Sequence, residues 1–250
     1  MKARFTGLGL TDPGLIRTVN QDDYYIDPEG RFFIVADGMG GHAGGQEASQ
    51  LAKEAIQSYL EQEWDSTIES QELLEQALYK ANQAILLDQQ SHPERADMGT
   101  TVVAVIVRNE QPWFAHVGDS RLYRLRGSNL EQITEDHTWV ARAMKAGDIT
   151  PEQARIHPWR HVLSQCLGRK DLQQVDVQPM DVQPGDRLLL CTDGLTEELS
   201  DNLIATNLQP NWTNDQSANL LVQTAKDKGG RDNITVVIVE VSDIDNSESL

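Results

Sequence analysis

The sequence predicts an α+β fold in which a β-sheet is covered on one face by other strands and on the opposite face by helices. Helices and strands occur in groups along the chain and do not alternate strictly, which argues against a purely parallel α/β sheet. Several predicted strands are apolar at almost every position, and such strands must be covered on both faces. The 250-residue chain is 39% hydrophobic and 24% charged, which is typical of a protein that folds around an ordinary core.

The strands are predicted from short runs of β-branched, aliphatic and aromatic residues. The first run, RFFIVA, ends at Asp37 and is followed by a glycine-rich turn. The later runs are TTVVAVIV at 100–107, PWFAHVG at 112–118, RLYRL at 121–125, DRLLLCT at 186–192 and ITVVIVEV at 234–241. The last run is apolar on both faces, so it is expected to lie between two covering layers.

Three longer helices are predicted from apolar residues that recur at helical spacing. The first covers 48–60, and the second runs from Ser66 through 85, with a capping-box spacing in Ser66-Thr-Ile-Glu69. A third helix begins at the capping box formed by Thr213 and Gln216.

The segment from 136 to about 175 differs from the rest, because it contains only short helical pieces. One of them begins at Thr150-Pro151-Glu152-Gln153, which combines an N-cap, a proline at the first helical position and a capping glutamine. We expect one domain over 1–242, with a flap at about 136–175 inserted into it. The acidic tail, 243–250, is expected to be disordered.

The net charge of −18, from 39 acidic and 21 basic residues, argues against nucleic acid and against an anionic membrane as partners. No apolar stretch near the amino terminus is long enough for a signal peptide or a membrane span. We therefore expect a cytoplasmic protein, and a monomer. The two cysteines, Cys166 and Cys191, lack the arginine six residues later that a cysteine-based tyrosine phosphatase loop requires.

The glycine-rich turn after the first strand fits two nucleotide-binding patterns by spacing, but neither by chemistry. Gly38 to Ala43 matches the dinucleotide fingerprint G-x-G-x-x-G/A, yet Asp37 would face a pyrophosphate with like charge. Gly40 to Gly45 has the spacing of a P-loop, but Gln46 and Glu47 follow where lysine and serine or threonine are needed.

Five aspartates border strong strands along the chain: Asp22, Asp37, Asp119, Asp193 and Asp232. Any one of them, taken alone, is explained as an ordinary turn residue beside a strand. If they meet at one edge of a sheet, two carboxylates about 4 Å apart repel each other by roughly 1 to 4 kcal/mol, unless cations lie between them. Oxygen ligands suit Mg²⁺ or Mn²⁺, and glycine beside Asp37 would let a main-chain carbonyl approach the metal.

A pair of such ions is the arrangement that hydrolyses phosphate esters, because it acidifies a bridging water and stabilises an in-line displacement. A basic residue is then needed to orient the phosphate. Arg17 lies five residues before Asp22, and its planar guanidinium suits a phosphate group.

The motifs LTDPGLIRTVNQDD, FFIVADGMGGHAGG, ADMGTT, HVGDSRLYRL, LLLCTDGLTEEL and GGRDNITVVIVEV occur in this order over nearly the whole chain. Together they resemble the metal-dependent protein phosphatase 2C (PPM) family of serine/threonine phosphatases. The resemblance is greatest to its small bacterial branch, which includes the phosphatases of the phosphorylated PII signalling protein.

The resemblance implies a four-layer αββα sandwich, with two central antiparallel sheets flanked by helices and metals in a channel at one end. It also implies roles for single residues. Asp37 would bridge two Mg²⁺ or Mn²⁺ ions and the Gly38 carbonyl would bind one of them, while Asp22, Asp193 and Asp232 would serve the other. Asp119 would bind a third ion together with Asp193, and Arg17 would bind phosphate.

One position departs from the family pattern. Many eukaryotic members carry histidine directly after Asp-Gly as a proposed general acid, but Met39 occupies that position here. Three alternatives follow: His42 is the acid, a water on the metal is the acid, or no acid is needed. In the flap segment HPWRHVLSQ, His157 and His161 are candidates for substrate contact, and His161 is the one we assign to substrate binding.

We therefore predict a metal-dependent phosphatase that hydrolyses phosphoserine and phosphothreonine in proteins, phospho-PII among them. Two alternatives remain at this point: a catalytically silent binding module on the same fold, and a phosphoesterase for small molecules. A dinucleotide-dependent oxidoreductase is a remote third.

Overall fold

The computed structural model describes residues 3–41, 44–172 and 175–243, which form two antiparallel sheets. The first, called here the β11 sheet, has the strand order β1 (Ala3–Asp12), β11 (Ile234–Asp243), β10 (Arg187–Cys191), β7 (Arg121–Arg126) and β8 (Asn129–Gln132). The second, the β3 sheet, has the order β2 (Asp22–Ile26), β3 (Phe32–Met39), β5 (Val102–Arg108), β6 (Gln111–Val117) and β9 (Val177–Pro179), with β4 (Gly99–Thr100) paired to β3.

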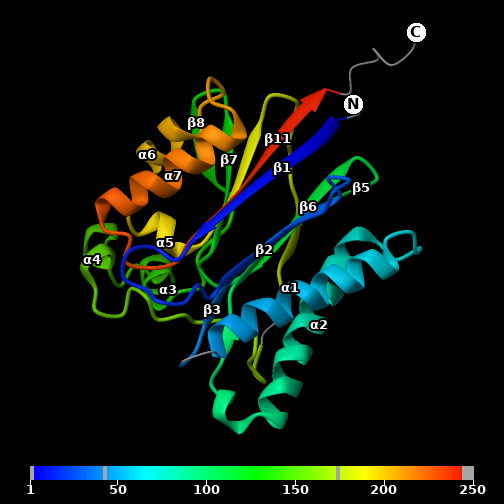
Figure 1. The fold of residues 1–250 in the computed structure, drawn as a ribbon, viewed down its shortest axis with the longest axis vertical. Helices are drawn as coiled ribbons and strands as arrows, with labels where there is room; N and C mark the ends of the chain where they lie inside the picture. Colours follow the sequence, from blue (N-terminus) through cyan, green and yellow to red (C-terminus); the bar gives the residue numbers. More distant parts are fainter. Residues whose placement is uncertain (1–2, 42–43, 173–174, 244–250) are drawn as a thin grey trace.

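Helices cover the outer face of each sheet (Figure 1). The β3 sheet is covered by α1 (Gly44–Glu63) and α2 (Ser70–Ser91), and the β11 sheet by α6 (Asp201–Asn207) and α7 (Asn214–Lys228). The remaining helical segments are the 3₁₀ helix Pro93–Arg95, α3 (Trp139–Ala146), α4 (Pro151–Ile156) and α5 (Asp193–Thr196). This arrangement confirms the predicted α+β class and the four-layer αββα sandwich.

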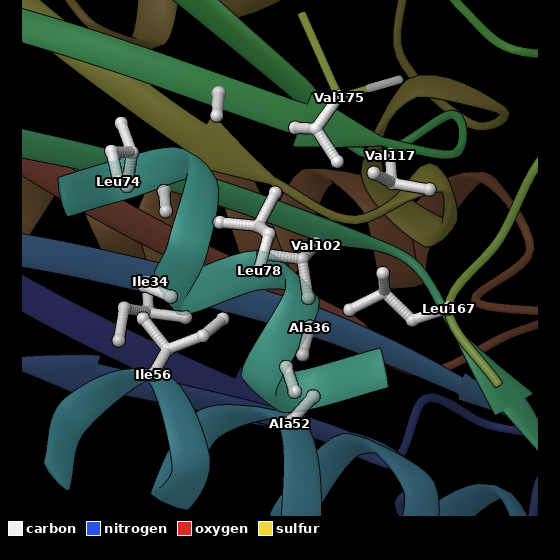
Figure 2. Close-up of a cluster of buried hydrophobic side chains, with 14 of the residues drawn as sticks. Ile34, Ala36, Ala52, Ile56, Leu74, Leu78, Val102, Val117, Leu167 and Val175 are labelled. Carbon is white, nitrogen blue, oxygen red and sulfur yellow. The ribbon is translucent and has the colours of Figure 1, made fainter. Parts of the chain in front are cut away.

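Strand β3 shows why the central strands are apolar on both faces. Successive side chains of a strand point to opposite faces, so Phe32, Ile34 and Ala36 pack with α1 and α2, whereas Phe33 and Val35 pack between the two sheets. Figure 2 shows the helix-side cluster, with side chains of β3 close to those of α1 and α2. Each full burial of such a side chain stabilises the fold by roughly 1.5 to 3 kcal/mol.

The same alternation occurs in β11, the last strand of the chain. Ile234, Val236 and Ile238 belong to the cluster under α6 and α7, whereas Val237 and Val239 belong to the layer between the sheets. The structure therefore has three apolar layers between its four layers of secondary structure, as the predicted two-sided burial of ITVVIVEV requires.

Two helix starts agree with the sequence, and one prediction is wrong. The capping boxes at Thr150 and Thr213 are both present, with reciprocal bonds to Gln153 and Gln216. Ser66, in contrast, does not cap α2, which begins at Ser70 after Glu69. The reason is a tertiary contact, because the Arg108 guanidinium donates to the main-chain carbonyls of 64, 66 and 68 and holds this segment as a turn.

The strand predicted at 100–107 is interrupted. Thr101 separates β4 from β5, because its main-chain N–H and the Thr100 hydroxyl both donate to the Asp37 carbonyl, at 2.9 and 2.8 Å. The Thr101 hydroxyl in turn accepts the Asp37 N–H at 3.1 Å. The break in the strand thus fixes the backbone of one predicted metal ligand.

Strand β1 was not predicted as a strand, and the other end of the chain also differs from expectation. Gly9 of β1 lies so close to the second sheet that a Cβ there would approach the Tyr24 ring to 2.3 Å. At the carboxyl end, β11 includes Asp243, which was assigned to the disordered tail, and the rest of that tail lies outside the described residues.

Candidate metal centre

Two of the predicted ligands face each other across neighbouring strands of the β3 sheet. Asp22 of β2 pairs directly with Asp37 of β3. Asp37 continues the row of Phe33 and Val35, so its side chain points into the space between the sheets. Because paired residues of an antiparallel ladder lie on the same face, Asp22 points into the same space.

The β11 sheet supplies two more carboxylates at this end of the sandwich. Asp193 begins α5 directly after β10, and Asp232 lies two residues before β11. Loops that are far apart in the sequence thus meet where the inter-sheet layer ends (Figure 1).

The other four aspartates act electrostatically on Asp37. Burial raises the pKa of Asp37 well above its ordinary value, and the charges of Asp22, Asp193, Asp119 and Asp232 raise that pKa further. The pKa of Asp193 is also raised well above its ordinary value, first by burial and then by Asp119 among other acids. Burial is again the main cause that raises the pKa of Asp22, and that of Asp119, to about 7.

Asp22 gives the clearest sign that this cluster suits a cation. Its Oδ2 accepts hydrogen bonds from the Thr192 and Thr235 hydroxyls at 2.9 and 2.7 Å. Its Oδ1 is buried and accepts no hydrogen bond from any residue that the structure describes. Carboxylate oxygens with one main-chain carbonyl form a ligand set that suits Mg²⁺ or Mn²⁺ rather than Zn²⁺. The residues present therefore fit the predicted ions.

Gly38 stands where only glycine fits. A Cβ on Gly38 would approach the main-chain oxygen of Gly45 to 1.9 Å and that of Gln21 to 2.6 Å. The missing side chain lets β3 lie directly against the start of α1 and against the residue that precedes Asp22. Gly38 thereby lies beside both paired aspartates.

Gly38→Ala is accordingly expected to lower the free energy of unfolding by more than about 3 kcal/mol, because the neighbouring groups are main-chain atoms that cannot move aside. Urea unfolding measures this change. Gly41→Ala, in the turn that follows β3, is the control, since a Cβ there meets nothing within 4 Å in the described part of the chain. Equal effects of the two substitutions would contradict the packing argument.

Arg17 lies at the mouth of the cluster. Its Nη2 donates to Asp232 Oδ2 at 2.7 Å, and the side chain is about half exposed. The bond to Asp232 is the main cause that raises the pKa of Arg17, with Asp193 and Asp37 contributing. The Arg17 loop is held by Asn233, which accepts from Gln21 N–H and donates to the carbonyls of 13 and 19.

His161, predicted to contact the substrate, lies close to Asp193 and Glu197. Its Nδ1 contacts a carboxylate oxygen of Glu197, and potential ligand atoms of His161, Glu197 and Asp193 all lie within 4.8 Å of one another. A groove of about 880 Å³ extends from Asp119 and Asp193 along residues of α3 and α4. The prediction for His42 falls outside the described residues.

Sequence reasoning did not assign roles to Thr192, Thr235, Asn233 or Glu197, although all four contact a predicted site residue or hold its loop. A signal was present for the two threonines. In the period-two pattern of their strands, Thr192 continues the row of Leu188 and Leu190, and Thr235 begins the row of Val237. A hydroxyl at the end of an apolar row indicates a polar partner at that end of the sandwich.

Comparisons with known proteins find similar phosphatases. Residues 17–226 match the protein phosphatase 2C family. The protein phosphatase PhpP of Streptococcus pneumoniae is 37% identical over 240 residues, covering 94% of this chain and 97% of PhpP. The crystal structure of the Mycobacterium tuberculosis serine/threonine phosphatase PstP/Ppp is similar, with a TM-score of 0.87 at 35% identity, covering 96% of this chain and 99% of that chain. The PstP catalytic domain in complex with two manganese ions has a TM-score of 0.85 at 34% identity, covering 97% of this chain and 100% of that chain.

Proposed function

Because the chain belongs to the protein phosphatase 2C family, we propose that its aspartate cluster hydrolyses phosphoserine and phosphothreonine in proteins with Mg²⁺ or Mn²⁺. The observation that carries this function is that acids from both sheets raise the pKa of Asp37, while the buried Oδ1 of Asp22 accepts no hydrogen bond from the described residues. The chain is thus a metal-dependent protein serine/threonine phosphatase.

The residues proposed to hold the ions all border the end of the inter-sheet layer. They are Asp22, Asp37, the Gly38 carbonyl, Asp193 and Asp232 for two ions, with Asp119 and Asp193 for a third. Divalent cations held by these residues would supply positive charge that lowers the pKa of an attacking water and neutralises the phosphoryl oxygens.

Arg17 is proposed to orient the phosphate of the substrate. Its bond to Asp232 fixes one edge of the guanidinium, and the group has further N–H donors for phosphate oxygens. Water then displaces the serine or threonine oxygen, the P–O ester bond breaks, and the leaving oxygen takes up a proton. His42 remains a proposed donor of that proton, and His161 a proposed substrate contact.

The cysteines support direct attack by water over a covalent enzyme intermediate. Cys191 is fully buried, and burial raises its pKa to about 12, so its thiol stays protonated at neutral pH. Cys166 is half-buried, and burial raises its pKa as well. Neither thiol has the lowered pKa of a cysteine nucleophile.

The activity is tested with p-nitrophenyl phosphate and then with phosphopeptides. We expect turnover that requires Mn²⁺ and stops with EDTA, and a higher kcat/KM for phosphothreonine peptides than for free phosphoserine. Absence of turnover with Mn²⁺ would favour a silent binding module. Equal kcat/KM for peptide and free phosphoserine would favour a small-molecule phosphoesterase.

Arg17→Ala is expected to raise KM for a phosphopeptide roughly 10- to 100-fold, the loss that follows removal of a charge-assisted hydrogen bond. Steady-state kinetics measure this, and Arg17→Lys should recover part of the loss. Arg4→Ala is the control, because Arg4 is exposed at the opposite end of β1 from the acids. An unchanged KM for Arg17→Ala would remove Arg17 from the phosphate site.

We also propose phospho-PII as a substrate, a monomeric state, a cytoplasmic location, and a catalytic domain over 1–242 with its flap at about 136–175. The motif resemblance supports the first of these, and the acidic surface charge of −18 supports a separate, soluble chain. No helix in the described residues is long and apolar enough to cross a membrane. Phosphate release from phospho-PII and sedimentation of the purified chain test the first two proposals.

A further inference from the structure

The two carboxylate oxygens of Asp22 have different surroundings, and threonines of the opposite sheet create the difference. Oδ2 receives hydroxyl protons from Thr192 and Thr235, both of which are fully buried. Oδ1 receives no hydrogen bond within the described part of the chain. Asp22 belongs to the β3 sheet and both threonines to segments of the β11 sheet, so these bonds link the two sheets.

The hydrogen bonds around Thr235 run in a single direction. The Thr235 hydroxyl has one proton, and that proton is used at Asp22 Oδ2. The Thr11 hydroxyl, 2.7 Å from the Thr235 hydroxyl, must therefore be the donor in that pair. Thr11 in turn accepts from the Asn20 amide at 2.8 Å. Each group therefore donates a hydrogen bond to the next, from Asn20 to Thr11, from Thr11 to Thr235, and from Thr235 to Asp22.

Thr192 is oriented in the same way by a main-chain donor. Its hydroxyl accepts the Thr235 N–H at 3.0 Å, which leaves its own proton for Asp22 Oδ2 at 2.9 Å. Thr11 and Thr235 are paired residues of the β1–β11 ladder, so strand register sets their spacing. Thr192 lies between β10 and α5, and its main-chain N–H donates to the Thr235 carbonyl at 3.1 Å, which holds it beside the same strand.

We infer that Thr192, Thr235 and Thr11 are positioning residues that saturate Oδ2 of Asp22 and present its Oδ1 to a divalent cation. The inference rests on the proposed metal centre, because it concerns how one of its ligands is aimed. A carboxylate that is free to rotate would offer either oxygen and would repel Asp37 in some orientations. The threonines fix one orientation before the cation arrives, which reduces the conformational freedom lost on binding.

Thr235→Val tests the inference, because valine keeps the shape of the side chain and removes the hydroxyl. Isothermal titration calorimetry with MnCl₂ is expected to show roughly 10- to 100-fold weaker binding to this variant than to the unaltered protein. Thr235→Ser should restore the affinity, since serine returns the donor. Thr134→Val is the control, because Thr134 is equally buried but its hydroxyl accepts from Leu122 N–H, away from Asp22.

A double variant tests the order of the hydrogen bonds. Thr11 acts through Thr235, so Thr11→Val/Thr235→Val should bind Mn²⁺ no more weakly than Thr235→Val alone. Additive losses would overturn the proposed order. Unfolding of each metal-free variant in urea separates a general loss of stability from a loss of Mn²⁺ affinity.

Two outcomes distinguish failure of this inference from failure of the proposed function. If Thr235→Val is less stable but binds Mn²⁺ as tightly as the unaltered protein, the threonines are structural and the inference is wrong. If the unaltered protein neither binds Mn²⁺ nor hydrolyses a phosphopeptide, the proposed function itself fails, and the inference fails with it.

Discussion

Asp37→Asn is expected to reduce phosphopeptide turnover by about two to three orders of magnitude while making the metal-free protein more stable at pH 7.5. Asparagine keeps the shape of the side chain but removes the charge that the other four aspartates repel. Loss of one such group from an active site typically has an effect of this size. Stability should rise because Asp37 lies half-buried next to like charges, and the neutral amide removes that repulsion.

A variant that only damaged the fold would lose both turnover and stability, whereas Asp37→Asn should lose turnover and gain stability. Steady-state kinetics with Mn²⁺ measure the first effect, and urea unfolding in EDTA measures the second. Asp65→Asn is the control, because Asp65 is exposed in the turn between α1 and α2 and should change neither quantity. If the metal-free Asp37→Asn protein proves less stable than the unaltered chain, Asp37 is not the point of greatest repulsion.

Chelation of the divalent cations is expected to abolish turnover and to lower stability more at pH 8 than at pH 5. Asp22 and Asp119 have folded-state pKa values of about 7, raised mainly by burial from a reference of 3.8. Between about pH 4 and pH 7 the folded state therefore holds protons that the unfolded state has released. By linkage, the metal-free protein loses stability as pH rises through this window, by an amount on the order of a few kcal/mol.

Bound cations should offset that loss, because they neutralise the ionised carboxylates. The increase in Tm caused by MnCl₂ should consequently be small at pH 5 and largest above pH 7. Thermal unfolding at four pH values, with MnCl₂ or with EDTA, measures this dependence. Asp22→Asn should reduce the difference between pH 5 and pH 8. An equal increase in Tm at both pH values would show that the carboxylates do not titrate as described.

Much of the fold was predictable because its strands are locally unambiguous. The run ITVVIVEV contains β-branched residues at both parities, which is consistent only with burial on two faces, and β11 indeed has apolar clusters on both sides. The capping boxes at Thr150 and Thr213 were equally clear, since each is a contact between residues three apart. The sequence was therefore enough to predict those features that depend on contacts between neighbouring residues.

The incorrect or missing predictions all concern contacts between distant residues. Ser66 has the spacing of a cap, but Arg108, about 40 residues later, holds that segment as a turn. Strand β1 is rich in glycine, which lowers its strand propensity, yet Gly9 is what allows the Tyr24 ring to pack against it. The same holds for the site. The position of each aspartate beside a strand is visible in the sequence, whereas the orientation of the Asp22 carboxylate depends on Thr235, 213 residues away.

The position of β11 has a consequence for how the enzyme is made. This last strand lies between β1 and β10, so the first strand of the chain has no place in its sheet until residues 234–243 have been synthesised. Asp232 lies two residues before that strand, so the proposed ligand set also stays incomplete until this part of the chain has been synthesised. A nascent chain that ends before residue 232 should therefore lack a complete proposed ligand set and should not dephosphorylate a phosphopeptide.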